Sequence, residues 1–269
     1  MLTIHLDPIL WHRGPLTLAW HGLFLTAGVA LGFWVFARQA RAQGVPREHL
    51  LELLLGALIS GTAGARLLQV FVYRWGTYAT QPLRVLALFE GGLAVYGGLI
   101  GGTLAVAAIA RHRKLPFWRL ADAAALGIAS GLIVGRIGCT IAGDVCGMPT
   151  GGAWGLVYTH PGSSVPARLL GVPTFPAPIA LEIANVALLA WLLVSRRRFR
   201  QPGTLFLAYL IAYSLARFVI NIWQGERALL LGLHPTQVIA VVVALSAAAA
   251  LLVRQRPAHS SPPPPLKAD

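Results

Sequence analysis

The chain has 269 residues, of which 56% are hydrophobic and 12% charged, and its mean hydropathy is +0.67. So few polar residues cannot cover a soluble domain of this size, and the composition therefore predicts a protein that crosses a membrane several times. The formal net charge of +13 could indicate a nucleic-acid partner. Because the basic residues gather in alternate loops, however, we expect no nucleic-acid partner and take the lipid bilayer as the partner of this charge.

Seven apolar stretches are long enough to span a bilayer, and they predict an all-α fold of about seven transmembrane helices. In chain order they are residues 16–37, 50–73, 93–110, 120–142, 178–194, 203–222 and 236–253. We expect residues 1–255 to form one transmembrane domain. The proline-rich residues 256–269 cannot build a core, so they are expected to be a disordered cytoplasmic tail.

The loops differ in charge, and this difference predicts the orientation of the chain. Fourteen of the 22 basic residues follow the first, third, fifth and seventh stretches. Short cytoplasmic loops are enriched in lysine and arginine, so these four segments are expected in the cytoplasm. The N-terminus and the loops after the second, fourth and sixth stretches then face outward.

Small residues mark two places where helices are expected to pack closely. Gly127, Gly131 and Gly135 recur at intervals of four residues, and Gly97, Gly98, Gly101 and Gly102 crowd the start of the third stretch. Glycines at this spacing let helix backbones approach one another in a membrane.

Arg136 lies inside the fourth stretch and needs an explanation. An arginine near the middle of a membrane helix costs about 2.5 to 3.5 kcal/mol on insertion scales, so such residues usually face a polar cavity and serve a function. An arginine near a helix end can instead extend its side chain to the membrane surface. Position alone leaves both interpretations open.

Other ionisable residues stand in the outer halves of the stretches: His21, Arg66, Glu90 and Arg217. Two arginines on different helices could bind one lipid phosphate, because the planar guanidinium contacts two oxygens at once and stays charged. Arg66 could instead form an ion pair with Glu90 that joins the second and third stretches. His21 and Tyr96 are the candidates for proton transfer, although a lone histidine in a helix more often serves only as a hydrogen-bonding residue.

Cys139 and Cys146 lie seven residues apart at the outer end of the fourth stretch. A disulfide is possible there, and a small apolar role for Cys139 is equally compatible with the pattern. Two cysteines without a nearby pair of histidines make a poor metal site, so we expect no metal.

Five segments in chain order resemble the bacterial prolipoprotein diacylglyceryl transferases. They are AWHGLFLTAGVALGF, GARLLQVFVYRW, LFEGGLAVYGGLIGG, LADAAALGIASGLIVGRIG followed by AGDVCGMPTGGAWGLVY, and GTLFLAYLIAYSLARF. The resemblance implies a seven-span enzyme of the bacterial plasma membrane that needs no cofactor or metal. Such an enzyme transfers the diacylglyceryl group from phosphatidylglycerol to the lipobox cysteine of a preprolipoprotein and releases glycerol phosphate.

The resemblance also implies roles for particular residues. Arg136 falls on the arginine of the family's signature, which is associated with phosphatidylglycerol, and Arg217 falls on its essential arginine in the sixth span. We therefore expect two sets of site residues. The catalytic set is His21, Tyr96 and Arg217, and the substrate-binding set is Arg136, Arg217, Gly97, Gly98 and Asp144.

The chain departs from the family's pattern at several of these positions. The family usually has Tyr at position 21 and His at position 96, so His21 and Tyr96 are exchanged. Cys139 and Ala142 replace two Asn of the signature, Asp144 replaces Glu, and Asn221 stands where Glu is expected. One hypothesis is that His21 and Tyr96 face the same cavity and together keep both functions. The alternative is a non-catalytic homologue that binds anionic lipid.

Overall fold

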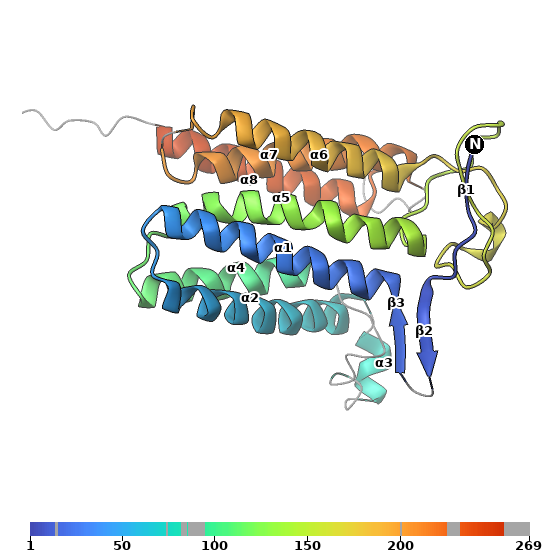
Figure 1. Ribbon diagram of the computed structural model, residues 1–269, viewed down its shortest axis with the longest axis horizontal. Helices are drawn as coiled ribbons and strands as arrows, with labels where there is room; N and C mark the ends of the chain where they lie inside the picture. Colours follow the sequence, from blue (N-terminus) through green and yellow to red (C-terminus); the bar gives the residue numbers. More distant parts are fainter. Residues whose placement is uncertain are drawn as a thin grey trace, which may run out of the picture. The chain divides into compact units, whose positions relative to one another are not determined.

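The computed structural model describes residues 1–13, 16–73, 75–81, 85, 95–199, 201–224 and 232–255, and these residues are mostly helical (Figure 1). Within these ranges, six helices are long and apolar enough to cross a membrane, which confirms a multi-pass membrane protein. They are α1 (Trp20–Ala42), α2 (Arg47–Leu68), α5 (Phe117–Ala142), α6 (Ala177–Ser195), α7 (Thr204–Ile220) and α8 (Pro235–Gln255).

The third expected stretch corresponds to α4 (Val95–His112), which is not one of these six helices. Its 18 residues include four glycines and the polar Arg111 and His112, which lower its mean hydropathy. The remaining elements are short: the π-helix η1 (Gln69–Tyr73), α3 (Trp75–Thr80), and the 3-10 helices η4 (Ala167–Leu169) and η5 (Asn221–Trp223). The proline-rich tail lies outside the described residues.

Four short strands correct the expectation of a purely helical chain. β1 (Leu2–Ile4) pairs in parallel with β4 (Leu156–Tyr158), and β2 (Ile9–Arg13) pairs antiparallel with β3 (Leu16–Ala19). The first apolar stretch was expected to be helical from residue 16, but α1 begins only at Trp20. The reason lies in the local sequence, because Thr17 alternates with Leu16 and Leu18 in the two-residue period of a strand.

The contacts divide the chain into two compact units, Leu25–Gly135 and a second formed by Met1–Phe24 with Arg136–Asp269. In the first of these, glycine contacts confirm the expected close packing of helices. Gly64 of α2 packs against Gly97 of α4, and Gly28 of α1 packs against Gly131 of α5. A Cβ atom at any of these four positions would collide with the facing backbone, so only glycine allows these approaches.

Arg66 also belongs to the unit Leu25–Gly135, where it is buried. Its Nε donates a hydrogen bond of 2.9 Å to the carbonyl of Val85, and its guanidinium carbon lies 5.2 Å from the ring centre of Tyr78. Glu90 lies outside the described residues, so an Arg66–Glu90 ion pair stays a prediction.

In the other unit, the loop after α5 forms backbone hydrogen bonds with the residues that follow α7, and these residues contact the segment before α6. The backbone of Gly147 pairs with Gln224, and the N–H of Met148 donates to the carbonyl of Trp223 over 2.8 Å. The ring of Trp223 in turn stacks on Phe175, with 5.4 Å between the ring centres. The loop after α5, the start of α6 and the residues after α7 are therefore held together.

Candidate active site

Helix α5 ends in a defined turn that directs Asp144 back toward the helix. Gly143 has a φ of +77°, the left-handed conformation that commonly follows the last helical residue. The N–H groups of Gly143 and Asp144 donate to the carbonyl of Cys139 over 2.9 and 3.3 Å. The Tyr158 hydroxyl donates to the carbonyl of Thr140 over 2.7 Å, which satisfies one of the open acceptors of the last turn. Burial raises the pKa of Tyr158, so its phenol stays a protonated donor.

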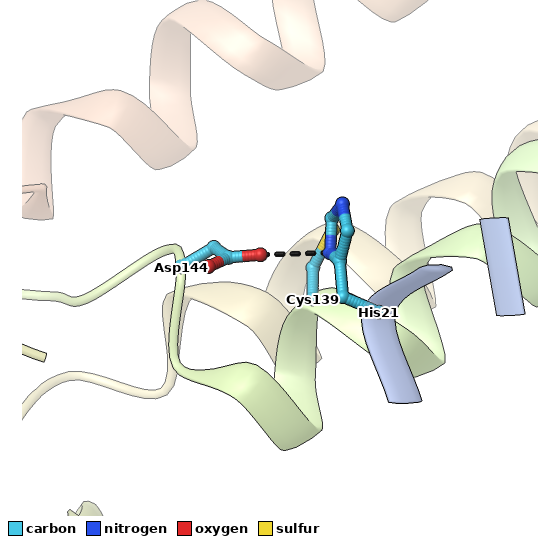
Figure 2. Close-up of side chains that lie close together, drawn as sticks. All are labelled: His21, Cys139 and Asp144. Carbon is cyan, nitrogen blue, oxygen red and sulfur yellow. Dashed lines mark hydrogen bonds and ion pairs between the residues drawn. The ribbon is translucent and has the colours of Figure 1, made fainter. Parts of the chain in front are cut away.

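This turn brings Asp144 to His21, at the start of α1, and to Cys139, in the last turn of α5 (Figure 2). His21 Nδ1 lies 2.8 Å from Asp144 Oδ2 and 3.7 Å from Cys139 Sγ. The side chains of His21 and Asp144 are 40% and 33% exposed, so solvent or a substrate can reach them. We call His21, Cys139 and Asp144 the His–Cys–Asp cluster.

A glycine explains how α1 and α5 come close enough to form this cluster. A Cβ atom at Gly138 would lie 3.0 Å from the Cα of His21 and 3.0 Å from the Cβ of Phe24. Real Cβ atoms rarely have such close neighbours, so the first turn of α1 can rest here only because residue 138 has no side chain. The approach places His21 beside Cys139, the next residue.

Asp144 carries a negative charge in this setting. Partial burial acts to raise its pKa, but hydrogen bonds from His21 and Ser164, together with the charges of His21 and Arg136, bring the pKa below its usual value. Ser164 is itself held in place, because its N–H donates to the carbonyl of Ala142 over 2.8 Å. The carboxylate is thus oriented from two sides.

Arg136 lies half-buried in α5, one turn before Thr140, whose hydroxyl donates to the Arg136 carbonyl over 3.0 Å. Its charge acts on the carboxylates of Asp144 and Glu182. Over the described part of the chain, however, no hydrogen bond or ion pair engages its guanidinium. The guanidinium can therefore bind an anion without giving up a protein partner.

Further along the same unit, a group of buried polar atoms has no hydrogen-bond partner among the described residues. The group consists of Glu182 Oε2, Arg217 Nη1, both side-chain polar atoms of Asn221, and Gln224 Nε2. Asn221 is fully buried, and it follows Arg217 by four residues at the end of α7. We call Glu182, Arg217, Asn221 and Gln224 the unpaired polar residues. Leaving a buried polar group unsatisfied costs about 1 to 3 kcal/mol, so a bound molecule that gives one of these atoms a partner would be stabilised.

The structure brings together two of the expected site residues, His21 and Asp144, and adds one that the sequence did not indicate. Cys139 was considered only for a disulfide or as a small apolar residue, because 118 residues separate it from His21. Both cysteines are free, and the thiol of Cys146 faces the hydroxyl of Thr174 at 3.8 Å. Burial raises the pKa of Cys146, which keeps it a protonated thiol.

Two further expectations concern the start of α4. The side chain of Tyr96 lies outside the described residues, so the hypothesis that His21 and Tyr96 share a cavity stays a prediction. Gly97 and Gly98 contact α2, where Gly97 faces Gly64 and Leu68 and Gly98 faces Gly61 and Ala65. They therefore serve helix packing, and a substrate-binding role for them stays a prediction too.

Comparison with known proteins identifies the family. The sequence model of the family described as prolipoprotein diacylglyceryl transferase matches residues 8–253. Relatives named phosphatidylglycerol–prolipoprotein diacylglyceryl transferase include that of Symbiobacterium thermophilum, which is 31% identical over 246 residues, or 91% of each chain. The relative from Geobacillus kaustophilus is 34% identical over 88% of each chain. That from Parasynechococcus marenigrum is 36% identical over 80% of this chain and 78% of its own. The chain therefore belongs to the prolipoprotein diacylglyceryl transferase family.

Proposed function

We propose that this protein transfers the diacylglyceryl group of phosphatidylglycerol to the lipobox cysteine thiol of a preprolipoprotein, at the bacterial plasma membrane. The names of its relatives support this reaction. One structural observation in this chain supports it as well. Arg217 Nη1 is buried within an apolar helix and lacks a hydrogen-bond partner in the described residues. A half-buried guanidinium with one buried and unpaired nitrogen favours an anion, and the phosphate of a membrane lipid is the anion that the reaction supplies.

On the donor side, the reaction breaks the bond between a glyceryl carbon and a phosphate oxygen. The sulfur of the acceptor forms a bond to that carbon, and glycerol phosphate leaves with the electron pair of the broken bond. Negative charge grows on the departing phosphate, so cations already in place lower the barrier. We assign this role to Arg136 and Arg217, because the Arg136 guanidinium and Arg217 Nη1 have no hydrogen-bond partner among the residues that the structure describes.

On the acceptor side, the nucleophile is a thiolate, so the thiol of the lipobox cysteine must lose its proton. The His21–Asp144 pair is suited to this step. It combines an imidazole with a charged carboxylate at 2.8 Å, and about a third or more of each side chain is open to an incoming substrate. We assign thiol activation to this pair, with Tyr96 as a further candidate for proton transfer.

The proposed orientation places both assignments on the same side of the membrane. We infer seven spans, with α4 as the seventh, an outward N-terminus and a cytoplasmic C-terminus, supported by the basic residues of the alternate loops. Under this topology, the start of α1 and the ends of α5 and α7 all lie at the outer surface. The lipobox cysteine of a translocated preprolipoprotein is expected on this side.

The test is complementation of a bacterial strain depleted of its own transferase, with mass spectrometry of a model lipoprotein. Wild-type protein is expected to restore the diacylglyceryl modification, and Arg136→Ala is expected to abolish it. Full modification by Arg136→Ala would remove this arginine from the phosphate site. A well-expressed wild-type chain that restores nothing would favour the second candidate, a non-catalytic homologue that binds anionic lipid. That candidate is favoured by Tyr96, Ala142 and Asn221, which replace polar residues of the family's pattern.

A further inference from the structure

The His–Cys–Asp cluster has an arrangement that differs from a catalytic triad. In a Cys–His–Asp triad, the carboxylate binds one imidazole nitrogen and the thiol approaches the other. Here Asp144 Oδ2 and Cys139 Sγ both approach His21 Nδ1, at 2.8 and 3.7 Å (Figure 2). A proton relay from thiol to carboxylate through the ring is therefore not built into this geometry. Three donor atoms, one from each side chain, instead surround a common point.

The spacing of the three donor atoms resembles one face of a tetrahedral metal site. All three lie within 4.8 Å of one another. With zinc bonds of about 2.3 Å to sulfur and about 2.1 Å to nitrogen and oxygen, tetrahedral edges are about 3.6 Å for N···S and about 3.4 Å for N···O. The 3.7 Å between Nδ1 and Sγ already fits. The 2.8 Å between Nδ1 and Oδ2 is a hydrogen bond that must open slightly, which a small rotation of the Asp144 side chain would allow.

The surroundings of the three side chains also fit a metal site. The partly exposed side chains of His21 and Asp144 leave one side of the cluster open. Three protein ligands with one open position are the arrangement of catalytic zinc sites.

The geometry points to a binding site for one divalent transition metal ion, zinc by its donor set, formed by His21, Cys139 and Asp144 with a fourth position open to the acceptor thiol. No metal was expected from the sequence, because only the two cysteines lie near each other along the chain. The part concerning the acceptor thiol rests on the proposed transferase function. The binding of the ion does not.

With an ion bound, His21 and Asp144 would be its ligands, and the ion would activate the acceptor thiol in place of the direct action of this pair. The thiol displaces a water molecule from the fourth position and binds as a thiolate, and its proton passes to solvent. The sulfur then forms its bond to the glyceryl carbon while the carbon–oxygen bond to phosphate breaks. Glycerol phosphate leaves with the electron pair, the thioether departs from the ion, and water returns. The ion keeps its charge throughout, so no oxidant or reductant is needed.

Metal binding is tested on the full-length protein in detergent, stripped with a chelator and then titrated with Zn²⁺ or Co²⁺. We expect about one ion per chain, and with Co²⁺ a sulfur-to-cobalt charge-transfer absorption that reports thiolate ligation. Cys139→Ser should abolish this absorption and weaken binding by more than about tenfold, since it removes a direct ligand.

Cys146→Ser is the matched control, since its thiol faces Thr174 and lies outside the cluster. It should bind the ion as the wild type does. The proposal is overturned if the wild-type protein takes up no ion, if its cobalt complex lacks the charge-transfer absorption, or if the two cysteine variants behave alike. The absorption is measured on the wild-type chain, so a variant that fails to fold leaves that result intact.

Lipidation measured on the same samples separates this inference from the proposed function. Loss of lipidation in stripped protein, restored by Zn²⁺, is expected. A stripped protein that lipidates at the full rate would overturn the role in thiol activation and leave the transferase function standing. A protein that binds the ion but never lipidates would overturn the transferase function and the thiol role while leaving the metal site standing.

Discussion

The His–Cys–Asp cluster and the unpaired polar residues belong to the same compact unit but satisfy their polar groups in opposite ways. In the cluster, the imidazole contacts both the carboxylate, at 2.8 Å, and the thiol, at 3.7 Å. Among the unpaired residues, Arg217 and Asn221 bury polar atoms that meet no partner in the described residues. Among the described residues, the first region pairs its polar side chains with one another, whereas the second contains buried polar atoms without a partner.

This difference suggests a division of labour. A preassembled group of donors suits the step that must act on a weakly acidic thiol, because its members are already oriented when the substrate arrives. Buried groups without partners suit the binding of a polar headgroup, because the ligand then relieves a cost that the free protein bears. If this division holds, changes in the second region should affect the lipid donor, and changes in the first should affect the thiol acceptor.

Among variants of the two regions, the largest effect is expected from Arg217→Ala. Removing a preorganised cation from a site where negative charge develops typically costs about 10² to 10³ in kcat, and we expect a loss of that size. Arg217→Lys should lose less, because it keeps the charge but not the two-oxygen contact. The measurement is the rate of lipidation in vesicles that contain phosphatidylglycerol.

The control for Arg217 is Arg38→Ala, which removes an arginine that stacks on Trp34 with 5.7 Å to the ring centre. It should keep the wild-type rate. Equal losses in both variants would mean that positive charge on the helices matters in general, and the comparison between the two regions would fail.

Asp144→Asn is expected to have the next largest effect. The change removes the charge that faces His21 but keeps the size of the side chain, so thiol activation should slow by about 10²-fold, the lower range for general acid–base groups. The KM for phosphatidylglycerol should stay near the wild-type value, since the donor region is untouched. Initial rates over a range of lipid concentrations measure both quantities. A raised KM with an unchanged kcat would place Asp144 with the donor instead.

Hydropathy was sufficient to predict most of the membrane fold. Six of the seven apolar stretches correspond to helices that can span a bilayer, because the length and apolar character of a span are local properties of the sequence. The start of α1 was wrong by four residues, since apolar content alone does not separate the strand at Leu16–Ala19 from the helix that follows. Glycine spacing predicted close contacts correctly but could not indicate which helix each glycine would face.

The site was predictable only in part. Arg136 and Arg217 stood out because a charge in an apolar stretch is conspicuous in the sequence itself. The partnership of His21 with Cys139 depends on the approach of two helices and on Gly138, and nothing near either residue indicates it. The side-chain atoms of Asn221 have no hydrogen-bond partner among the described residues. This too could not be predicted from the sequence, because it depends on how the folded chain buries the residue.

A smaller effect is expected from Gly138→Ala, which tests how the cluster is positioned. The added methyl group would lie 3.0 Å from the Cα of His21, so α1 must shift, at a cost of about 1 to 3 kcal/mol of stability. Activity should fall together with the melting temperature, because His21 moves away from Cys139. Gly135→Ala is the matched control in the same helix, since open space surrounds that position. It should be as stable as the wild type or slightly more so, given the higher helix propensity of alanine.

The smallest effect on stability is expected from Asn221→Leu. The residue is fully buried, and neither of its side-chain polar atoms has a hydrogen-bond partner among the described residues. An apolar side chain of similar size therefore removes two unsatisfied polar atoms and breaks no hydrogen bond to those residues. The free energy of unfolding should therefore stay within about 1 kcal/mol of the wild-type value, or rise. Phosphatidylglycerol binding should nevertheless weaken by about tenfold, the loss expected for one hydrogen bond of about 1.4 kcal/mol. Thermal unfolding with and without lipid measures both effects. A variant that is strongly destabilised in the absence of lipid would show that Asn221 stabilises the fold. The contrast between the His–Cys–Asp cluster and the unpaired polar residues would then rest on Arg217 alone.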